Sequence, residues 1–371
     1  MQITTLTILI LLFLTLVIQL YYLFRYHSAL IGYKIKDVLQ DIVHPVSVVI
    51  SARNEEKNLR ENLLSVLDQD YPDFEVIVVN DCSWDDSEEV LKEFSERHKN
   101  LKVVTINEHE RFKHGKKFAL TLGIKAASKD ILLFTDADCV PASENWIRRM
   151  QQHFTGNIEI ALGYSPYTKE KGLLNKLIRF ETFFTAVNYL SFALKGRPYM
   201  GVGRNLAYKR DLFFTAKGFA SHMHILSGDD DLFVNQNATA ENTAIEIHPD
   251  AQVWSVPQNT FSSYFRQKMR HFSAGKVYKK THQFSLSLQV ISASVFYATI
   301  AASILLKAPW YYILTGYAVR LLFQLIIYAP VLRKLSYKDL FLFFVPFDLI
   351  YYFYVLAVSI ITLFKKKVQW R

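Results

Sequence analysis

Four long apolar segments frame a polar middle. They span residues 3–24, 286–306, 311–332 and 340–364. At about 1.5 Å per residue, each is at least about 30 Å long, which is the thickness of the hydrocarbon core of a membrane. We therefore predict an N-terminal transmembrane anchor over residues 1–25 and a C-terminal transmembrane region over residues 286–364. A cleaved signal peptide is the alternative for the first segment, but it lacks a basic region before it and a small-x-small cleavage site after it.

Charges beside these segments predict the topology. Basic residues from Arg25 to Lys36 follow the first segment, so the positive-inside rule places the N-terminus outside and the polar middle in the cytoplasm. We expect an integral protein of the cell inner membrane. If all four segments span, Arg333 and Lys334 fall inside as expected, but the basic tail at 365–371 falls outside, against the rule. Because Pro346 interrupts the last segment, a re-entrant or interfacial hairpin is the alternative there.

Two ionisable residues lie within the apolar C-terminal segments. Arg320 lies 15 residues before Leu335, at the centre of the connecting loop, and Asp348 lies 13 residues after it. In antiparallel helices the two side chains would reach similar depth, where each is costly unless it meets a partner or water. We predict an ion pair, with a water-filled cleft as the alternative.

The polar middle changes to short β-branched runs that alternate with helical stretches. Strands are predicted at 46–51, 75–80, 101–106 and 131–135, and helices at 55–67, 87–97 and 116–127. This alternation is typical of an α/β domain with a mostly parallel sheet and flanking helices. We expect one such domain over residues 44–280, with a first half at 44–150 and a second half at 151–280.

Acidic residues follow two of the predicted strands. Asp81 comes after the second strand, and Asp136 and Asp138 come after the fourth. Ligands of open α/β sheets bind beyond the carboxyl ends of strands, so these side chains should converge on one crevice. Two carboxylates at i and i+2 suit Mg²⁺ or Mn²⁺ held together with substrate phosphates, although a helix-capping turn is the alternative. Lys116, at a predicted helix start after His114, suits an anionic ligand.

The formal net charge of +9 and the 51% of hydrophobic residues fit this division of the chain. The positive residues flank the apolar segments and form no basic stripe interleaved with aromatic residues, so nucleic acid is excluded as a partner. Cys82 and Cys139 each follow a strand-end acid by one residue. In the cytoplasm, and beside a site of oxygen ligands, we expect two reduced thiols.

Several motifs in the first half resemble the nucleotide-sugar half of family 2 glycosyltransferases, which have the GT-A fold. They lie at residues 45–56, 68–75, 79–86, 115–120 and 134–138. The resemblance implies that Asp81 contacts the uracil and that Glu55 and the backbone near Ala52 line the nucleotide pocket. It also implies that Asp136 approaches the ribose or diphosphate, and that Asp138, with Asp136 beside it, ligates the metal. Where the family often has Tyr, this chain has Arg53, which adds a cation beside the nucleotide.

Two motifs in the second half resemble the membrane-embedded branch of the same family. Residues 227–235 are similar to the acidic motif of hyaluronan, chitin and cellulose synthases, which assigns the catalytic base to Asp230. Gln267 and Arg270 match the Q-x-x-R-W motif of these synthases and of ceramide glucosyltransferase, but His271 replaces the tryptophan. The alternatives are a solvated helix cap at 229–231 and an exposed face of an amphipathic helix.

Together these features predict a membrane-bound, metal-dependent inverting glycosyltransferase that moves a sugar from a nucleotide-sugar donor, by resemblance a UDP-sugar, to a lipid or glycan acceptor. A carboxylate base would take the acceptor's proton, while the metal, Lys116 and Arg270 would neutralise the departing diphosphate. The alternatives are a processive polysaccharide synthase and a non-catalytic nucleotide-sugar-binding subunit. Three C-terminal segments are few for a channel, and His271 departs from the motif, so we favour a lipid-linked acceptor.

Separate expectations apply to two further segments of the polar middle. Residues 172–194 are apolar nearly all round but include Lys176, Arg179 and Glu181, so either a helix in the membrane interface or a buried core helix is expected. Residues 201–207 lack the last glycine of a dinucleotide fingerprint, and the family resemblance places them near the acceptor.

Overall fold

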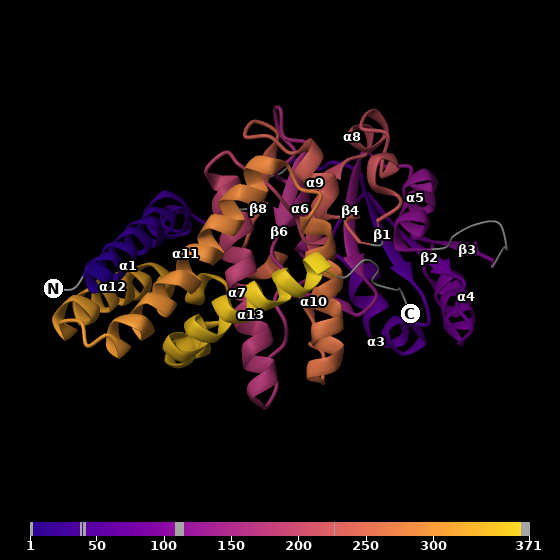
Figure 1. Ribbon diagram of the computed structural model, residues 1–371. Coiled ribbons are helices and arrows are strands. Elements are labelled where there is room, and N and C mark those ends of the chain that lie inside the picture. Colours follow the sequence, from indigo (N-terminus) through magenta and orange to yellow (C-terminus); the bar gives the residue numbers. More distant parts are fainter. Residues whose placement is uncertain (1–2, 38, 40–41, 108–114, 226, 365–371) are drawn as a thin grey trace.

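The computed structural model describes residues 3–37, 39, 42–107, 115–225 and 227–364. A sheet with flanking helices occupies one side of the molecule, and an arm of long helices extends from the other (Figure 1).

The central sheet has seven strands in the order β3-β2-β1-β4-β7-β6-β8. The strands are β1 (Val46–Ala52), β2 (Phe74–Asp81), β3 (Leu101–Ile106), β4 (Ile131–Asp136), β6 (Ile160–Gly163), β7 (Leu206–Lys209) and β8 (Thr243–Glu246). The first four strands are parallel, which confirms the predicted mostly parallel α/β sheet. β7 runs antiparallel to β4 and β6, and β6 pairs in parallel with β8. The register sets Ser51 opposite Asp136 and Ala52 opposite Asn80, so three neighbouring strands end at one edge.

Helices cover both faces of the sheet, which is why its strands read as continuous apolar runs. One face packs against α3 (Glu56–Leu67), α4 (Ser87–Arg97) and α6 (Trp146–Gln151). The other packs against α5 (Lys116–Ala126) and α7 (Leu173–Leu194). The helix α5 approaches the sheet closely at Gly123, where an added Cβ would lie 2.8 Å from Cγ1 of Val49 and 2.9 Å from Cγ2 of Val79.

Shorter elements connect the two halves of the domain. They are α8 (Arg210–Thr215), α9 (Asp231–Asn237), α10 (Phe261–Gly275) and the antiparallel pair β5 (Cys139–Pro141) and β9 (Val253–Ser255). The pairing of β5 with β9 ties the chain that follows Asp138 to the second half of the domain.

The helix α7 is buried along most of its length, so the structure selects the core helix from the two alternatives for this segment. Its charged residues are partnered. Arg179 donates two hydrogen bonds to Asp339, at 2.9 and 2.7 Å, and Glu181 forms an ion pair with Lys268.

Within the part of the chain that the structure describes, four helices are long and apolar enough to cross a membrane, as predicted. The first, α1 (Ile3–Tyr22), continues through a π-helical turn (Leu23–His27) into α2 (Ala29–Gly32); the others are α11 (Lys280–Leu305), α12 (Trp310–Lys334) and α13 (Phe344–Phe364). A 3-10 segment (Lys338–Phe343) precedes α13. Pro346 lies in the first turn of α13, where a missing N–H costs little, so the last segment is a continuous helix. The basic tail at 365–371 lies outside the described residues.

The predicted pair between Arg320 and Asp348 is present. Arg320 Nη1 lies 2.6 Å from Asp348 Oδ2, and the two side chains are 1% and 3% exposed. Tyr297 and Gln324 also donate to the Asp348 carboxylate, at 2.5 and 3.0 Å. The pair therefore joins α11, α12 and α13 through a buried polar network.

The arm of long helices is fastened to the α/β domain. The Tyr164 hydroxyl donates to the carbonyl of Leu335 at 3.0 Å, and Arg179 of α7 pairs with Asp339 just before α13. Lys334 Nζ donates to the carbonyls of Leu30, Ile31 and Tyr33. One apolar core runs through both parts, so the long apolar helices and the domain pack as one unit.

Candidate active site

A cavity of about 1410 Å³ opens where β1, β2 and β4 end. Residues from α7, α10, α11 and α13 complete its walls. Asp81, Asp136 and Asp138 all line it, so the strand-end acids converge on one crevice as the sequence predicts.

Asp136 and Asp138 form a suitable pair of ligands for a hard cation. Their carboxylate oxygens and the thiol of Cys139 lie within 4.8 Å of one another. Burial and the charge of Asp136 raise the pKa of Asp138, so the two carboxylates repel and a divalent cation between them would relieve this cost. Burial also raises the pKa of the Cys139 thiol, which keeps it protonated and leaves an oxygen donor set that fits Mg²⁺ or Mn²⁺. Cys82 and Cys139 are both reduced thiols, as expected.

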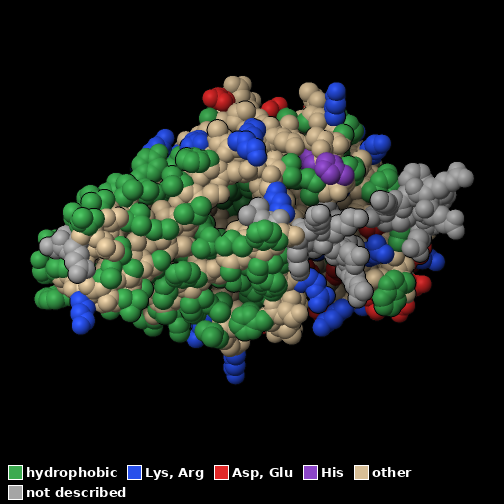
Figure 2. All heavy atoms as spheres, viewed as in Figure 1, with side chains coloured by type: hydrophobic (Ala, Val, Ile, Leu, Met, Phe, Trp, Pro, Cys, Tyr) green, Lys and Arg blue, Asp and Glu red, His purple; other side chains and the backbone are tan. Residues whose placement is uncertain are grey.

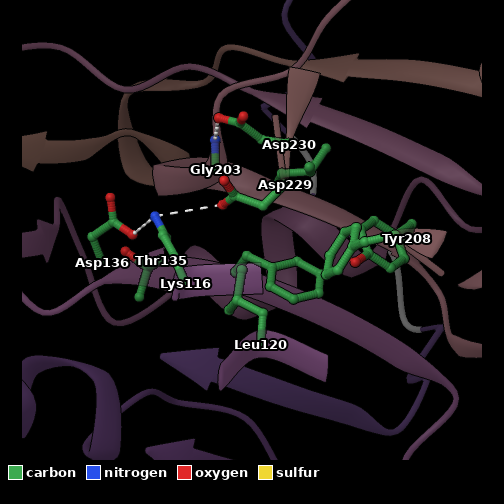
Figure 3. Close-up of a pocket in the computed structure, with 11 residues that line it drawn as sticks. Lys116, Leu120, Thr135, Asp136, Gly203, Tyr208, Asp229 and Asp230 are labelled. Atoms are coloured by element: carbon green, nitrogen blue, oxygen red, sulfur yellow. Dashed lines mark hydrogen bonds and ion pairs between the residues drawn. The ribbon is translucent and has the colours of Figure 1, made fainter. Parts of the chain in front are cut away.

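Lys116 joins this acid pair to the acidic loop of the second half. It lies at the start of α5, and its Nζ donates to Asp136 Oδ1 at 2.7 Å and lies 3.6 Å from Asp229 Oδ2 (Figure 3). Burial opposes its charge, but Asp136 and Asp229 outweigh burial and raise the pKa of Lys116. The lysine therefore stays charged and holds together acids that are far apart in the sequence.

The loop before α9 carries three consecutive carboxylates, of which Asp229 and Asp230 lie close to Lys116. Gly228 has φ +93°, and a Cβ there would meet Leu232 Cδ1 at 2.4 Å, so the turn requires glycine. Asp230 caps α9, because its Oδ1 accepts from its neighbour's N–H and its Oδ2 accepts from Gly203 N–H, each at 2.7 Å. Asp231 accepts from the Tyr278 hydroxyl at 2.7 Å.

The structure shows the position of Asp230, which the sequence offered either as a catalytic base or as a helix cap. It caps a helix, and it also lines the cavity next to Asp229. Burial and the charge of Asp229 raise the pKa of Asp230 to about 6. A carboxyl group with such a pKa can accept a proton near neutral pH.

At the other end of the cavity lie the residues assigned to the nucleotide. Glu55 and Asp81 line it, with Arg53 beside them. Ala52 is itself buried beneath the strand end, while its neighbours Ser51 and Arg53 face the cavity. Burial raises the pKa of Glu55, which accepts a hydrogen bond from the Asn58 side chain.

The acceptor-side motif also lines the cavity. Gln267, Arg270 and His271 lie on α10 and line the cavity. The polar side of this amphipathic helix therefore faces the site. Ser227 Oγ donates to the carbonyl of Arg270 at 3.0 Å, which ties the helix to the acidic loop. The structure thus brings the predicted site residues around one cavity, except Ala52, which is buried between two residues that line it.

Three lining residues were missed by the sequence reasoning. Asp229 lies in the same acidic run as Asp230, but the sequence assigned a role only to Asp230. Trp84 is 83% exposed at the nucleotide end, and a flat aromatic residue in a strand-end loop was a usable signal. Arg204 stacks over the Tyr167 ring, 4.3 Å from its centre, and its charge favours the ionised forms of both metal-site carboxylates. Its segment shows no sequence signal for this role.

Comparisons with known proteins agree with this geometry. Residues 47–215 match the model of glycosyl transferase family 2. The glycosyltransferase AglE of Haloferax volcanii is 32% identical over 130 residues, which cover 34% of this chain and 41% of that protein. A poly-beta-1,6-N-acetyl-D-glucosamine synthase of Staphylococcus epidermidis is 36% identical over 98 residues, covering 26% of this chain and 23% of the synthase. The matches thus span less than half the length of these relatives.

A solved structure extends the likeness to the whole fold. The mannosyltransferase PcManGT from Pyrobaculum calidifontis, determined with GDP-Man and Mn²⁺, superposes with a TM-score of 0.66 at 19% identity, covering 97% of this chain and 99% of that one. The matched residues 47–215 include the strand-end acids and the strands β2 and β4 that carry them. Residues 47–215 of this chain are therefore similar to glycosyl transferase family 2, and the chain as a whole has a GT-A-like fold.

Proposed function

We propose that the protein is a membrane-bound, metal-dependent inverting glycosyltransferase that transfers a sugar from a nucleotide-sugar to a lipid or glycan acceptor. The observation that carries this proposal is the Lys116 bridge, because it sets the metal-site acid Asp136 and the acidic loop at Asp229 against one cavity. A donor diphosphate and an acceptor hydroxyl can therefore meet there. Because basic residues follow the first apolar segment on the side of the domain, we place the domain on the cytoplasmic side of the membrane.

The donor would lie across the ends of β1, β2 and β4. Asp81 and Glu55 border the nucleoside end, and Arg53 adds a cation there. A UDP-sugar is the donor that the sequence motifs favour. The structural relative was determined with GDP-Man, so the nucleobase of the donor has to be identified by experiment.

The diphosphate would lie beside Asp136 and Asp138, which would hold Mg²⁺ or Mn²⁺. When bound, the cation supplies positive charge to the diphosphate leaving group. Lys116, Arg204 and Arg270 add fixed cations at the same place. With this charge in position, the oxygen–carbon bond to the diphosphate can break without a general acid.

The acceptor hydroxyl would attack the anomeric carbon from the opposite face and lose its proton to a carboxylate. One C–O bond forms, the bond to the diphosphate breaks, and the configuration inverts. Asp230 is our candidate base, since each of its oxygens keeps a second lone pair beyond the backbone hydrogen bond. Asp229 faces the same space, but its carboxylate forms an ion pair with Lys116.

Substitution of single carboxylates tests this assignment. With labelled donor and detergent-solubilised protein, Asp230→Asn should lower kcat by about 10² to 10⁴ and leave the donor KM within a few fold. Asp211→Asn is the matched control, because Asp211 is exposed on α8. Full activity of Asp230→Asn would remove Asp230 as the base, and loss in Asp229→Asn alone would pass the role to Asp229.

A further inference from the structure

The cavity does not end at the acidic loop. It continues between two of the candidate membrane spans, where its walls are formed by Leu286, Val290 and Ile291 of α11 and by Val355, Leu356 and Ile360 of α13. Ile291 and Ile360 are 50% and 45% exposed. The lining therefore changes from charged to aliphatic along its length, and Figure 2 shows a hollow bordered by hydrophobic side chains on this face.

The packing of α13 keeps this passage in place. Ser294 Oγ of α11 contacts the carbonyl of Tyr352 at 3.5 Å, which joins the two spans midway. Beyond that point α13 is fastened to α10. Lys276 Nζ donates to the carbonyl of Thr362 at 2.5 Å, and the rings of Tyr264 and Tyr354 stack at 5.8 Å. Because each end of this half of α13 has its own attachment, the space between α11 and α13 is part of the fold.

A polar belt separates the aliphatic passage from the catalytic acids. Glu181 of α7 and Lys268 of α10 form an ion pair in the cavity wall, with side chains only 7% and 10% exposed. Thr185, Asn188 and Gln289 line the same stretch. Neutral hydrogen-bonding groups with a balanced charge pair suit a polyol headgroup, which offers donors and acceptors but no net charge.

We propose that the acceptor is a membrane lipid with an uncharged, hydroxyl-bearing headgroup, which enters between α11 and α13 and places its hydroxyl at the acidic loop. The inference rests on the proposed function and names its acceptor class. The aliphatic walls stabilise a lipid chain by removing it from water, whereas they offer nothing to a soluble glycan.

The charges of the site favour a hydroxyl over a phosphate as the nucleophile. A lipid phosphate is already ionised, so it needs no base. It would also add a negative charge beside the three carboxylates at 229–231, which line the cavity. A neutral hydroxyl avoids this repulsion and has a use for a carboxylate that accepts its proton.

Blocking the passage tests the proposal. Ser287 of α11 and Ser359 of α13 line it, so Ser287→Trp and Ser359→Trp should obstruct it. Ala298→Trp and Ala357→Trp are the matched controls, because these alanines are exposed on the same helices and lie outside the cavity lining. The full chain is placed in phosphatidylcholine vesicles that contain dioleoylglycerol and is given labelled UDP-glucose, UDP-N-acetylglucosamine or GDP-mannose with Mn²⁺.

We expect organic-extractable label with dioleoylglycerol, and at least a tenfold fall in that label for the two cavity variants. Hydrolysis of the donor by water should stay within twofold in every variant, which shows that the site is folded. Unchanged lipid labelling in both cavity variants would overturn the proposal. So would label that enters only undecaprenyl phosphate in parallel vesicles, or only a soluble oligosaccharide such as chitotetraose. Donor hydrolysis without any labelled lipid removes the lipid acceptor alone, whereas no hydrolysis with Mn²⁺ or Mg²⁺ refutes the proposed function.

Discussion

The ion pair between Arg320 and Asp348 gives a quantitative test of how the membrane helices are held together. Asp348→Asn keeps the shape of the side chain but removes its charge, which leaves Arg320 unpaired in a site that is 1% exposed. Breaking a buried pair from one side costs about 3 to 5 kcal/mol. For 371 residues, an unfolding entropy of about 0.8 kcal/mol/K turns this cost into a Tm about 4 to 6 °C lower.

The assay is thermal unfolding of the purified chain in detergent. Arg320→Met should lower Tm by a similar amount, because the Asp348 carboxylate then loses its cation while Tyr297 and Gln324 still donate to it. The charge-swapped double variant, Arg320→Asp with Asp348→Arg, should recover part of the loss. Asp211→Asn, an exposed carboxylate on α8, controls for the chemistry of the substitution.

The double variant decides the result. If the swapped chain is no more stable than either single variant, the two side chains do not stabilise each other as a pair. A Tm for Asp348→Asn within 1 °C of the parent would also refute the magnitude, because water would then be solvating Arg320 in place of its partner.

Three further predictions concern the α/β domain. Burial raises the pKa of Glu75, but hydrogen bonds from Lys102, Ser47 and Ser128 outweigh it and lower this pKa to about 2, below the 4.5 of the unfolded chain. The contribution of the ionised Glu75 to folding stability is therefore fully present above pH 4.5 and is lost as the pH falls toward 2. Glu75→Gln should remove about 3 kcal/mol at pH 7 and flatten denaturant stability between pH 4.5 and 2; an unchanged slope would contradict it. Gly123→Ala should lower the free energy of unfolding by about 1 to 3 kcal/mol, because the added methyl group would push α5 away from Val49 and Val79. An unaltered urea midpoint would contradict this prediction. Since the pKa of Asp230 is raised to about 6, kcat should fall tenfold per pH unit below about 6, and this acid limb should vanish from the residual activity of Asp230→Asn.

Much of the first half of the domain could be predicted because its signals are local. The strands β1, β2 and β4 are parallel and almost entirely buried, so each is a short apolar run between helices with their own periodicity. The depth of Arg320 and Asp348 followed from counting residues around one loop. Such features need no knowledge of distant segments.

The second half depended on distant partners. The sequence left open whether α7 is a core helix or lies in the membrane interface, because nothing nearby in the sequence shows that Arg179 meets Asp339 and that Glu181 meets Lys268. The bridge from Lys116 to Asp229 joins residues from separate halves of the domain, so only the folded chain shows which member of the acidic run it contacts. The short strands β6 and β8 pair in parallel across more than 80 residues, and four residues in each are too few to give a distinct pattern.

The central claim is that the acid pair at the end of β4 supports metal-dependent chemistry on a nucleotide-sugar. Its most direct test is the release of nucleotide from labelled UDP- and GDP-sugars by the full-length protein, with Mn²⁺ or with EDTA, in the parent chain and in Asp138→Ala. The account predicts release that requires Mn²⁺ or Mg²⁺ in the parent and falls at least a hundredfold in Asp138→Ala, while the thermal unfolding of the variant without metal stays within a few degrees of the parent. Equal release by Asp138→Ala and the parent, or release unaffected by EDTA, would contradict it.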